Sequence, residues 1–252
     1  MKPAGLACAL GIVGLLGLPT AVRAQTPTPD TGPGGGTLPP EIPVFPLQDV
    51  MLFPNISRPL HIFEPRYRVM VADALRGDRI IGMVLLQPGH ETEYEGRPPI
   101  YPIGCAGVIT DVVELPDGRY DIVLRGLMKF RVASEDQSQA YRLARIEPIP
   151  EVPDDDERDA LRMQRARLMS LLASIAPHLE PPPPELPDED LVNGLAQYLD
   201  LDPLDRQGLL ERAGPLARSE ALIDLLEIEV TLPLAGATLG PAHAIFQFIR
   251  TP

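Results

Sequence analysis

The sequence predicts an α+β fold, in which a small, bent β sheet or pseudo-barrel is followed by a compact bundle of α-helices. Residues 41–150 hold short apolar runs, an Asp-Gly turn and many prolines, which are typical of short strands joined by sharp corners. After Pro150 the apolar residues recur at helical spacing instead. Strands followed by helices are typical of the α+β class, and 252 residues are enough to bury a sizeable core.

Residues 1–24 have the three parts of a secretory signal peptide. These parts are a positive charge at Lys2, a short apolar run, and small residues before a cleavage site after Ala24. We therefore expect an exported protein, periplasmic or secreted, that meets a membrane only transiently through this segment. The alternative is a cytoplasmic protein with a misassigned start codon. Residues 25–40 are rich in Pro, Gly and Thr, which predicts a flexible tether before a fold that starts near Glu41.

Several patterns predict strands in the first unit, residues 41–150. Residues 80–86 form a continuous apolar run that suits a buried strand. Residues 104–115 and 119–132 are rich in β-branched residues and flank a Pro-Asp-Gly sequence, which is a strong hairpin signal. Residues 141–149 alternate between apolar and polar side chains, as a half-buried strand does. This unit is therefore expected to be mostly β.

Prolines shape the beginning of the same unit. Each one fixes φ and lacks an N–H donor, so the strands between them must be short, edge-like or sharply turned. These prolines are Pro43, Pro46, Pro54, Pro59 and Pro65. Pro65 also suits the first turn of a helix, which is predicted to end at Gly77. The apolar face of that helix consists of Tyr67, Met70, Val71, Ala74 and Leu75.

Residues 151–230 are predicted to form a small bundle of four amphipathic helices. The first begins with a run of acidic residues and is broken by four prolines at 181–184. The second follows these prolines, the third opens with the Asp-Pro pair at 202–203, and the fourth opens at 214–215. Short helices are marginal alone, so each must pack on a neighbour. Residues 231–252 show no clear period, and their shape stays open.

Composition narrows the range of partners. The chain carries 22 basic and 35 acidic residues, and residues 1–24 hold two of the basic ones and none of the acidic ones, so the expected mature net charge is −15. A surface this acidic repels phosphate backbones, so nucleic acid is not expected as a partner. Cleavage also removes Cys8, which leaves Cys105 without a disulfide partner. We interpret Cys105 as a buried, apolar residue.

The usual catalytic motifs are missing from the sequence. Lys129 is the one lysine of the expected mature chain, and no Gly-Lys-Ser/Thr sequence could form a Walker A loop for ATP. A Ser–Lys dyad would have to use Lys129, which we expect to keep its ammonium group in solvent. The sequence has no Gly-x-Ser-x-Gly elbow, and its four histidines are scattered. We therefore expect no ATP, metal or other cofactor and no enzymatic activity.

One polar cluster precedes and enters the first predicted helix. The candidate binding residues in it are His61, Glu64, Arg66 and Tyr67. Glu64 is expected to pair with Arg66 or Arg68 and so to fix the corner between strand and helix. A contact with a ligand at the same corner is the alternative. The apolar residues nearby, which we expect in the core, are Phe45, Phe53, Ile62 and Phe63.

The stretch IPVFPLQDVMLFPNISRPLHIFEPRYRVM, residues 42–70, resembles the start of the substrate-binding amino-terminal domain of Lon proteases. The likeness continues through the hairpin at 104–132 and the helices at 197–229, so it covers almost the whole expected fold. It implies a PUA-like β pseudo-barrel followed by a helical subdomain that recognises unfolded or damaged polypeptides. The ATPase and Ser–Lys protease domains of that family are missing here, so the chain resembles its stand-alone members.

Three hypotheses for function follow. The first is a non-catalytic module that binds an unfolded polypeptide or a partner protein on apolar surface between the pseudo-barrel and the helices. The second is an envelope hydrolase whose active groups meet only in the folded chain. The third is an oligomeric scaffold whose helical half packs on a partner.

Overall fold

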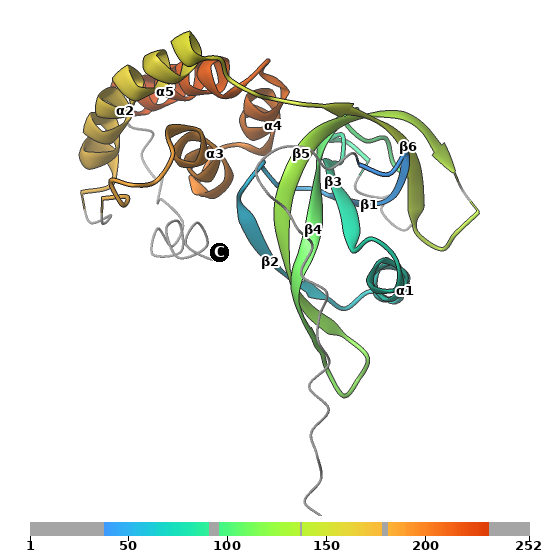
Figure 1. Ribbon diagram of the computed structural model, residues 1–252. Coiled ribbons are helices and arrows are strands. Elements are labelled where there is room, and N and C mark those ends of the chain that lie inside the picture. Colours follow the sequence, from blue (N-terminus) through green and yellow to red (C-terminus); the bar gives the residue numbers. More distant parts are fainter. Residues whose placement is uncertain (1–37, 91–95, 137, 178–180, 232–252) are drawn as a thin grey trace, which may run out of the picture. The chain divides into compact units, whose positions relative to one another are not determined.

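The computed structural model describes residues 38–90, 96–136, 138–177 and 181–231 (Figure 1). The expected signal peptide, nearly all of the expected tether, and the segment from residue 232 onward lie outside the described residues. The described chain confirms the α+β class, because a mixed sheet comes first and most of the helices follow it.

The strands of the described chain are β1 (Glu41–Leu47), β2 (Ser57–Ile62), β3 (Ile80–Leu85), β4 (Ile103–Glu114), β5 (Tyr120–Asp136) and β6 (Arg142–Ile149). The helices are α1 (Pro65–Arg76), α2 (Asp155–Ile175), α3 (Asp188–Tyr198), α4 (Pro203–Glu211) and α5 (Pro215–Thr231). Helix α1 connects β2 to β3, whereas α2 to α5 follow the last strand (Figure 1).

The strands form one sheet in the order β2-β5-β4-β3-β1-β6, and β5 pairs again with β6. Five strands therefore close into a ring, and β2 extends the sheet beyond it. The length of β5 allows this closure, because Tyr120–Arg125 pairs with β2 and Lys129–Asp136 pairs with β6. Register shifts next to Gly107 and Ser134 bend the long strands, as β-bulges do. The result is the predicted bent pseudo-barrel.

The Asp-Gly turn joins β4 to β5 as the sequence predicts. Gly118 has a φ of 78°, a conformation that suits glycine, and its N–H donates to the carbonyl of Leu115 at 2.9 Å. Arg68 from α1 donates to the carbonyl oxygen of Asp117 in the same turn, at 3.0 Å. The turn is therefore tied to the first helix as well as to its own strands.

Helix α1 buries the predicted face against the sheet. Tyr67, Met70, Val71 and Ala74 are buried, and the Tyr67 ring lies 4.4 Å from the ring of Phe45 between centroids. The expected core residues Phe45, Phe53 and Ile62 are buried too. The expectation for Phe63 was wrong, because its side chain is 60% exposed. Phe63 lies between β2 and α1, where its ring stacks with the ring of His61 on the surface of the described chain.

The helices after the sheet bury leucines against one another and share one hydrophobic core with the sheet. Helix α2 begins with a capping box, in which Asp154 and Glu157 each accept a hydrogen bond from the other's backbone N–H. The buried leucines of these helices are Leu161, Leu168, Leu171 and Leu172 of α2, Leu191 and Leu195 of α3, Leu209 and Leu210 of α4, and Leu222 and Leu226 of α5. The predicted helical bundle is therefore present, and α3 is one of its links to the sheet.

Polar side chains of α3 hold the corner at Phe53-Pro54-Asn55, which precedes β2. Gln197 accepts a hydrogen bond from the Phe53 N–H at 2.9 Å, and its amide nitrogen donates to the carbonyl of Ser57 at 3.0 Å. Asn193 donates to the carbonyl of Pro54 at 3.1 Å. The Phe53 N–H and the Pro54 carbonyl lie before the first residue of β2, so the amides of α3 satisfy them. The stiff, proline-rich opening of the fold thus serves as a docking point for the helices.

Lys129 does not keep its ammonium group in solvent, which corrects the sequence-based expectation. Its side chain is 3% exposed, and Nζ lies 2.6 Å from a carboxylate oxygen of Glu151. Nζ also donates to the carbonyls of Leu210 and Arg212 at the carboxyl end of α4. Burial lowers the pKa of Lys129, while the hydrogen bond with Glu151 acts in the opposite direction. The lysine side chain can be buried because these partners satisfy the hydrogen bonds and the charge of its ammonium group in the interior.

Glu151 is shared between two buried cations. Both of its carboxylate oxygens accept hydrogen bonds from Nη2 of Arg218, at 2.8 and 2.9 Å, and Arg218 is fully buried. Arg218 also donates to Asn193 of α3 and to the carbonyl of Leu209. One carboxylate in the connection between β6 and α2 therefore ties β5 to α5. We call Lys129, Glu151 and Arg218 the Glu151 cluster.

Replacing Glu151 with glutamine should destabilise the fold strongly, because it leaves two buried cations without a counter-charge. Removing one partner of a buried ion pair costs about 3–5 kcal/mol. Urea unfolding followed by far-UV circular dichroism measures the loss in the free energy of unfolding.

The matched control is Arg167→Gln, which breaks the exposed Arg167–Glu227 ion pair, whose side chains are 55% and 44% exposed. Exposed pairs contribute about 0–1 kcal/mol. Equal losses for the two variants would show that the Glu151 cluster does not hold the two halves together.

Candidate functional site

The candidate residues from the sequence lie at the corner between β2 and α1, but they face different surfaces. Glu64 precedes α1, and its carboxylate lies 3.0 Å from Nη2 of Arg66, which confirms the expected ion pair. The Arg66 guanidinium also lies over the ring of Tyr67, 4.6 Å from its centroid. Arg66 and Tyr67 line one pocket, whereas His61 lines a separate groove.

His61 belongs to a polar group on the exposed side of β2. Its Nδ1 lies 2.6 Å from a carboxylate oxygen of Asp121, and its Nε2 lies 3.2 Å from Nη1 of Arg119. The imidazole stacks on the exposed ring of Phe63 with centroids 6.2 Å apart. These contacts hold the histidine in place and separate it from Arg66 and Tyr67.

The groove beside His61 lies across β2, β5 and β4 and has a volume of about 420 Å³. We call it the outer groove; it is lined by Pro59, Leu60, His61, Asp111, Val112, Val113, Asp121, Ile122 and Val123. Paired strand residues share a face, so His61, Asp121 and Val113 form one row across the three strands. Val113 is 58% exposed. The outer groove is therefore shallow, largely apolar, and polar at its rim.

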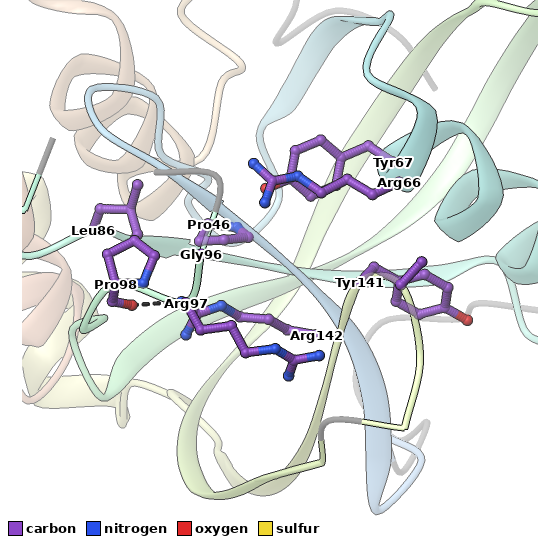
Figure 2. A pocket seen from close by; sticks show the side chains of 10 residues that line it. Pro46, Arg66, Tyr67, Leu86, Gly96, Arg97, Pro98, Tyr141 and Arg142 are labelled. Carbon is purple, nitrogen blue, oxygen red and sulfur yellow. Dashed lines mark hydrogen bonds between the residues drawn. The ribbon is translucent and has the colours of Figure 1, made fainter. Parts of the chain in front are cut away.

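A second pocket, which we call the arginine pocket, has a volume of about 200 Å³. It is lined by Pro46, Arg66, Tyr67, Leu86, Gly96, Arg97, Pro98, Ala140, Tyr141 and Arg142. Figure 2 shows Arg66 and Tyr67 extending from α1, and Arg97 and Arg142 lying beside each other. Of the lining residues that the structure describes, three are arginines and none is acidic, although the whole chain has an excess of acidic residues.

Hydrogen bonds hold two of these arginines in place. Arg142 donates to Glu135 at 2.8 Å and to the carbonyl of Pro98, and its side chain is 7% exposed. Arg97 donates to the carbonyls of Asp136 and Gln139 at 3.2 and 3.1 Å. Within the part of the chain that the structure describes, Arg97 has no carboxylate partner. The pocket is thus lined by guanidinium groups that cannot move far.

Tyr141 forms part of the wall of the arginine pocket and is buried. Its hydroxyl donates to the Asp73 carboxylate at 2.9 Å. Burial and this hydrogen bond raise the pKa of Tyr141 to about 12, because both disfavour the phenolate. The phenol therefore stays neutral at any ordinary pH and links the residue before β6 to α1.

A third pocket, the junction pocket, lies between the end of β3 and the start of α4 and has a volume of about 230 Å³. Its lining residues are Gln48, Leu85, Leu86, Gln87, Pro88, His90, Pro98, Asp202, Pro203 and Leu204. Leu204 is 48% exposed. The junction and arginine pockets share Leu86 and Pro98, so they are neighbours on one surface. This surface lies between pseudo-barrel and helices, where the sequence-based hypothesis places a polypeptide.

The two reactive side chains that the sequence analysis considered, Cys105 and Lys129, are buried and contribute to the stability of the fold. Cys105 is fully buried, and burial raises the pKa of its thiol well above the usual range. Lys129 is held in the Glu151 cluster. Among the described residues, no group of three or more His, Cys, Asp or Glu side chains could hold a metal ion. No helix in the same residues is long and apolar enough to cross a membrane.

Three residues of this surface were missed by the sequence analysis: Arg97, Arg142 and Leu204. Arg97 follows β3 and precedes β4, Arg142 starts β6, and Leu204 lies in the first turn of α4. None belongs to a local motif, and they meet only because the ring of strands closes and the helices dock. The run of prolines around Arg97 was the one local sign of a constrained segment.

The sequence matches the family model of the ATP-dependent protease La (LON) substrate-binding domain over residues 41–227. The Lon protease of Trichlorobacter lovleyi is 31% identical over 201 residues, which are 76% of this chain and 24% of that protein. The Lon protease of Anaeromyxobacter dehalogenans is 27% identical over 196 residues, which are 75% of this chain and 23% of that protein. The chain thus spans about a quarter of the length of these relatives.

Among solved structures, the N-terminal domain of Mycobacterium avium complex Lon protease has a similar fold, with a TM-score of 0.55 and 19% sequence identity. The likeness covers 74% of this chain and 98% of that one. At this identity the likeness concerns the fold alone.

Because Tyr141 is buried, we expect its contribution to the free energy of unfolding to depend on pH in the alkaline range. Its folded pKa is raised from 10.0 to about 12, so its contribution to stability is fully present below pH 10 and is lost as the pH rises toward 12. The difference in urea midpoint between the wild type and Tyr141→Phe should be constant below about pH 10 and decline above it. A difference that stays constant up to about pH 11 would contradict this burial.

Proposed function

The chain belongs to the Lon substrate-binding domain family, and on this premise we propose that it is a non-catalytic module that binds unfolded polypeptide or a partner protein. The observation that carries the proposal is the junction pocket with the arginine pocket beside it. A concave, mainly apolar surface with a few fixed polar groups is the usual form of a binding site. Meeting points between structural units are common places for such sites.

The chemistry of the junction pocket suits a segment of apolar polypeptide. Leu86, Pro88, Pro98, Pro203 and Leu204 supply apolar surface. Prolines have little conformational freedom to lose, so contact with them costs little entropy. Burying one leucine-sized side chain contributes about 1.5–3 kcal/mol, so useful affinity requires several such contacts along a chain. A module of this kind holds its clients reversibly.

Binding without nucleotide or proteolysis is part of the proposal. Its support is the match to the substrate-binding domain and the position of Lys129 and Cys105, which are both buried. The chain covers about a quarter of the Lon relatives, so their whole activity is not transferred to it.

Binding is tested with the mature chain and a panel of fluorescent apolar peptides and reduced, unfolded proteins, with cleavage recorded in parallel. We expect binding to unfolded chains, no cleavage, and no response to ATP. Leu204→Gln removes exposed apolar surface from the junction pocket and should weaken binding about fivefold, which corresponds to about 1 kcal/mol.

The matched control is Val113→Gln, which makes the same kind of change in the outer groove and should leave affinity unchanged. Loss of binding in Val113→Gln alone would move the site to the outer groove. Equal affinity for folded and unfolded clients would refute recognition of unfolded chains, and cleavage would revive the hydrolase hypothesis.

We propose further that the mature protein begins at Gln25 and works in the periplasm or outside the cell. The support is the signal-peptide pattern of residues 1–24. Mass spectrometry of the protein from an envelope extract should show Gln25 as the first residue. An intact N-terminus in the cytoplasmic fraction would contradict export.

A further inference from the structure

We propose that the arginine pocket binds the free carboxylate at the C-terminus of a polypeptide. This inference rests on the proposed function and names the group that the surface recognises. The junction pocket would hold an apolar side chain of the same polypeptide close to its end. The argument comes from the charge, the geometry and the size of the pocket.

The charge of the pocket is opposite to that of the chain. Arg66, Arg97 and Arg142 line it, and none of the described lining residues is acidic, whereas the whole chain has a net charge of −13. Like charges in a concave site repel one another, so an anion between them is favoured. Glu64 and Glu135 pair with two of the arginines. Among the described residues, the guanidinium of Arg97 has only backbone carbonyls as partners.

The geometry of Arg97 suits a carboxylate. A guanidinium group has five N–H donors in a planar fork, and two nitrogen atoms of Arg97 donate to the carbonyls of Asp136 and Gln139. These two bonds fix the orientation of the side chain and leave further N–H groups as donors. Arg142, which lies beside it in Figure 2, is fixed by Glu135 and Pro98. A planar, pre-positioned pair of guanidinium groups matches a planar carboxylate.

The size of the pocket selects a small anion. Its volume of about 200 Å³ is below the range of about 300–1,000 Å³ that is usual for drug-sized ligands. A polyanion is disfavoured by the acidic charge of the whole chain. The wall contains Pro46, Leu86 and the rings of Tyr67 and Tyr141, which suit an apolar side chain next to the carboxylate. A chain end with an apolar last residue has both features.

The test compares a short fluorescein-labelled peptide that ends in leucine with the same peptide carrying a C-terminal amide. Fluorescence anisotropy with the mature wild-type chain should give about tenfold tighter binding for the free acid, as expected for one charge-assisted hydrogen-bonded contact. N-acetyl-leucine and N-acetyl-leucinamide, used as competitors, separate a free small carboxylate from a polypeptide end.

Variants of Arg97 connect this difference to the pocket. Arg97→Gln should bind the acid and the amide equally, and Arg97→Lys should recover only part of the preference, because lysine keeps the charge but loses the fork. Arg119→Gln, which removes an exposed arginine on the β4–β5 turn, should keep the full preference. Circular dichroism and urea unfolding show that each variant is folded.

Each possible outcome either supports or overturns a specific part of the proposal. A preference for the acid that disappears in Arg97→Gln supports the inference. Equal affinity of the wild type for the acid and the amide overturns it, while the proposed function stands. Displacement of the peptide by N-acetyl-leucine with an affinity equal to that of the peptide itself overturns the assignment to a polypeptide end. Absence of binding for every peptide and unfolded protein overturns the proposed function itself.

Discussion

The Glu151 cluster is the interaction on which the rest of the structure depends. A single carboxylate accepts from Arg218 of α5 and from Lys129 of β5, and the same lysine donates to the last carbonyls of α4. Buried ions are stable only when their partners are well placed, so we expect the cluster to favour the observed position of the helices on the sheet over others. Cations at the carboxyl end of a helix also offset its dipole. The distance between Leu204 of α4 and Leu86 at the end of β3, and so the junction pocket, follows from this constraint.

Neutral hydrogen bonds from α3 form a second attachment between the helices and the sheet, in addition to the Glu151 cluster. The amides of Asn193 and Gln197 hold the backbone of the corner before β2, and Asn193 also accepts from Arg218. The two attachments are therefore coupled through Asn193. Gly126 lies opposite this corner in β5, and a Cβ there would lie only 2.0 Å from the carbonyl oxygen of Phe53. Absence of a side chain at Gly126 thus lets the corner approach the sheet. The proline-rich opening of the fold is a rigid part to which the helices attach.

Local patterns in the sequence predicted most of the elements, because each depends on neighbours in the chain. The Asp-Gly turn, the apolar face of α1 and the proline breaks between helices are of this kind. The position of Lys129 was mispredicted because its partner Glu151 and the carbonyl of Leu210 are remote in sequence. Arg97 and Arg142 were missed for the same reason. Their proximity depends on ring closure between β5 and β6, and no local period encodes it.

The proposed selectivity for unfolded chains has a physical basis in the shape of the surface. A pocket of about 200 Å³ admits a side chain or a chain end, but not a folded surface. Folded proteins bury most of their large apolar side chains, so an exposed apolar residue close to a chain end is more common in unfolded molecules. The arginines and prolines that line the surface are fixed before a client arrives, which lowers the entropy lost on binding. In the proposed function, a rigid site of this kind distinguishes its clients by what they expose, without nucleotide and without a conformational change.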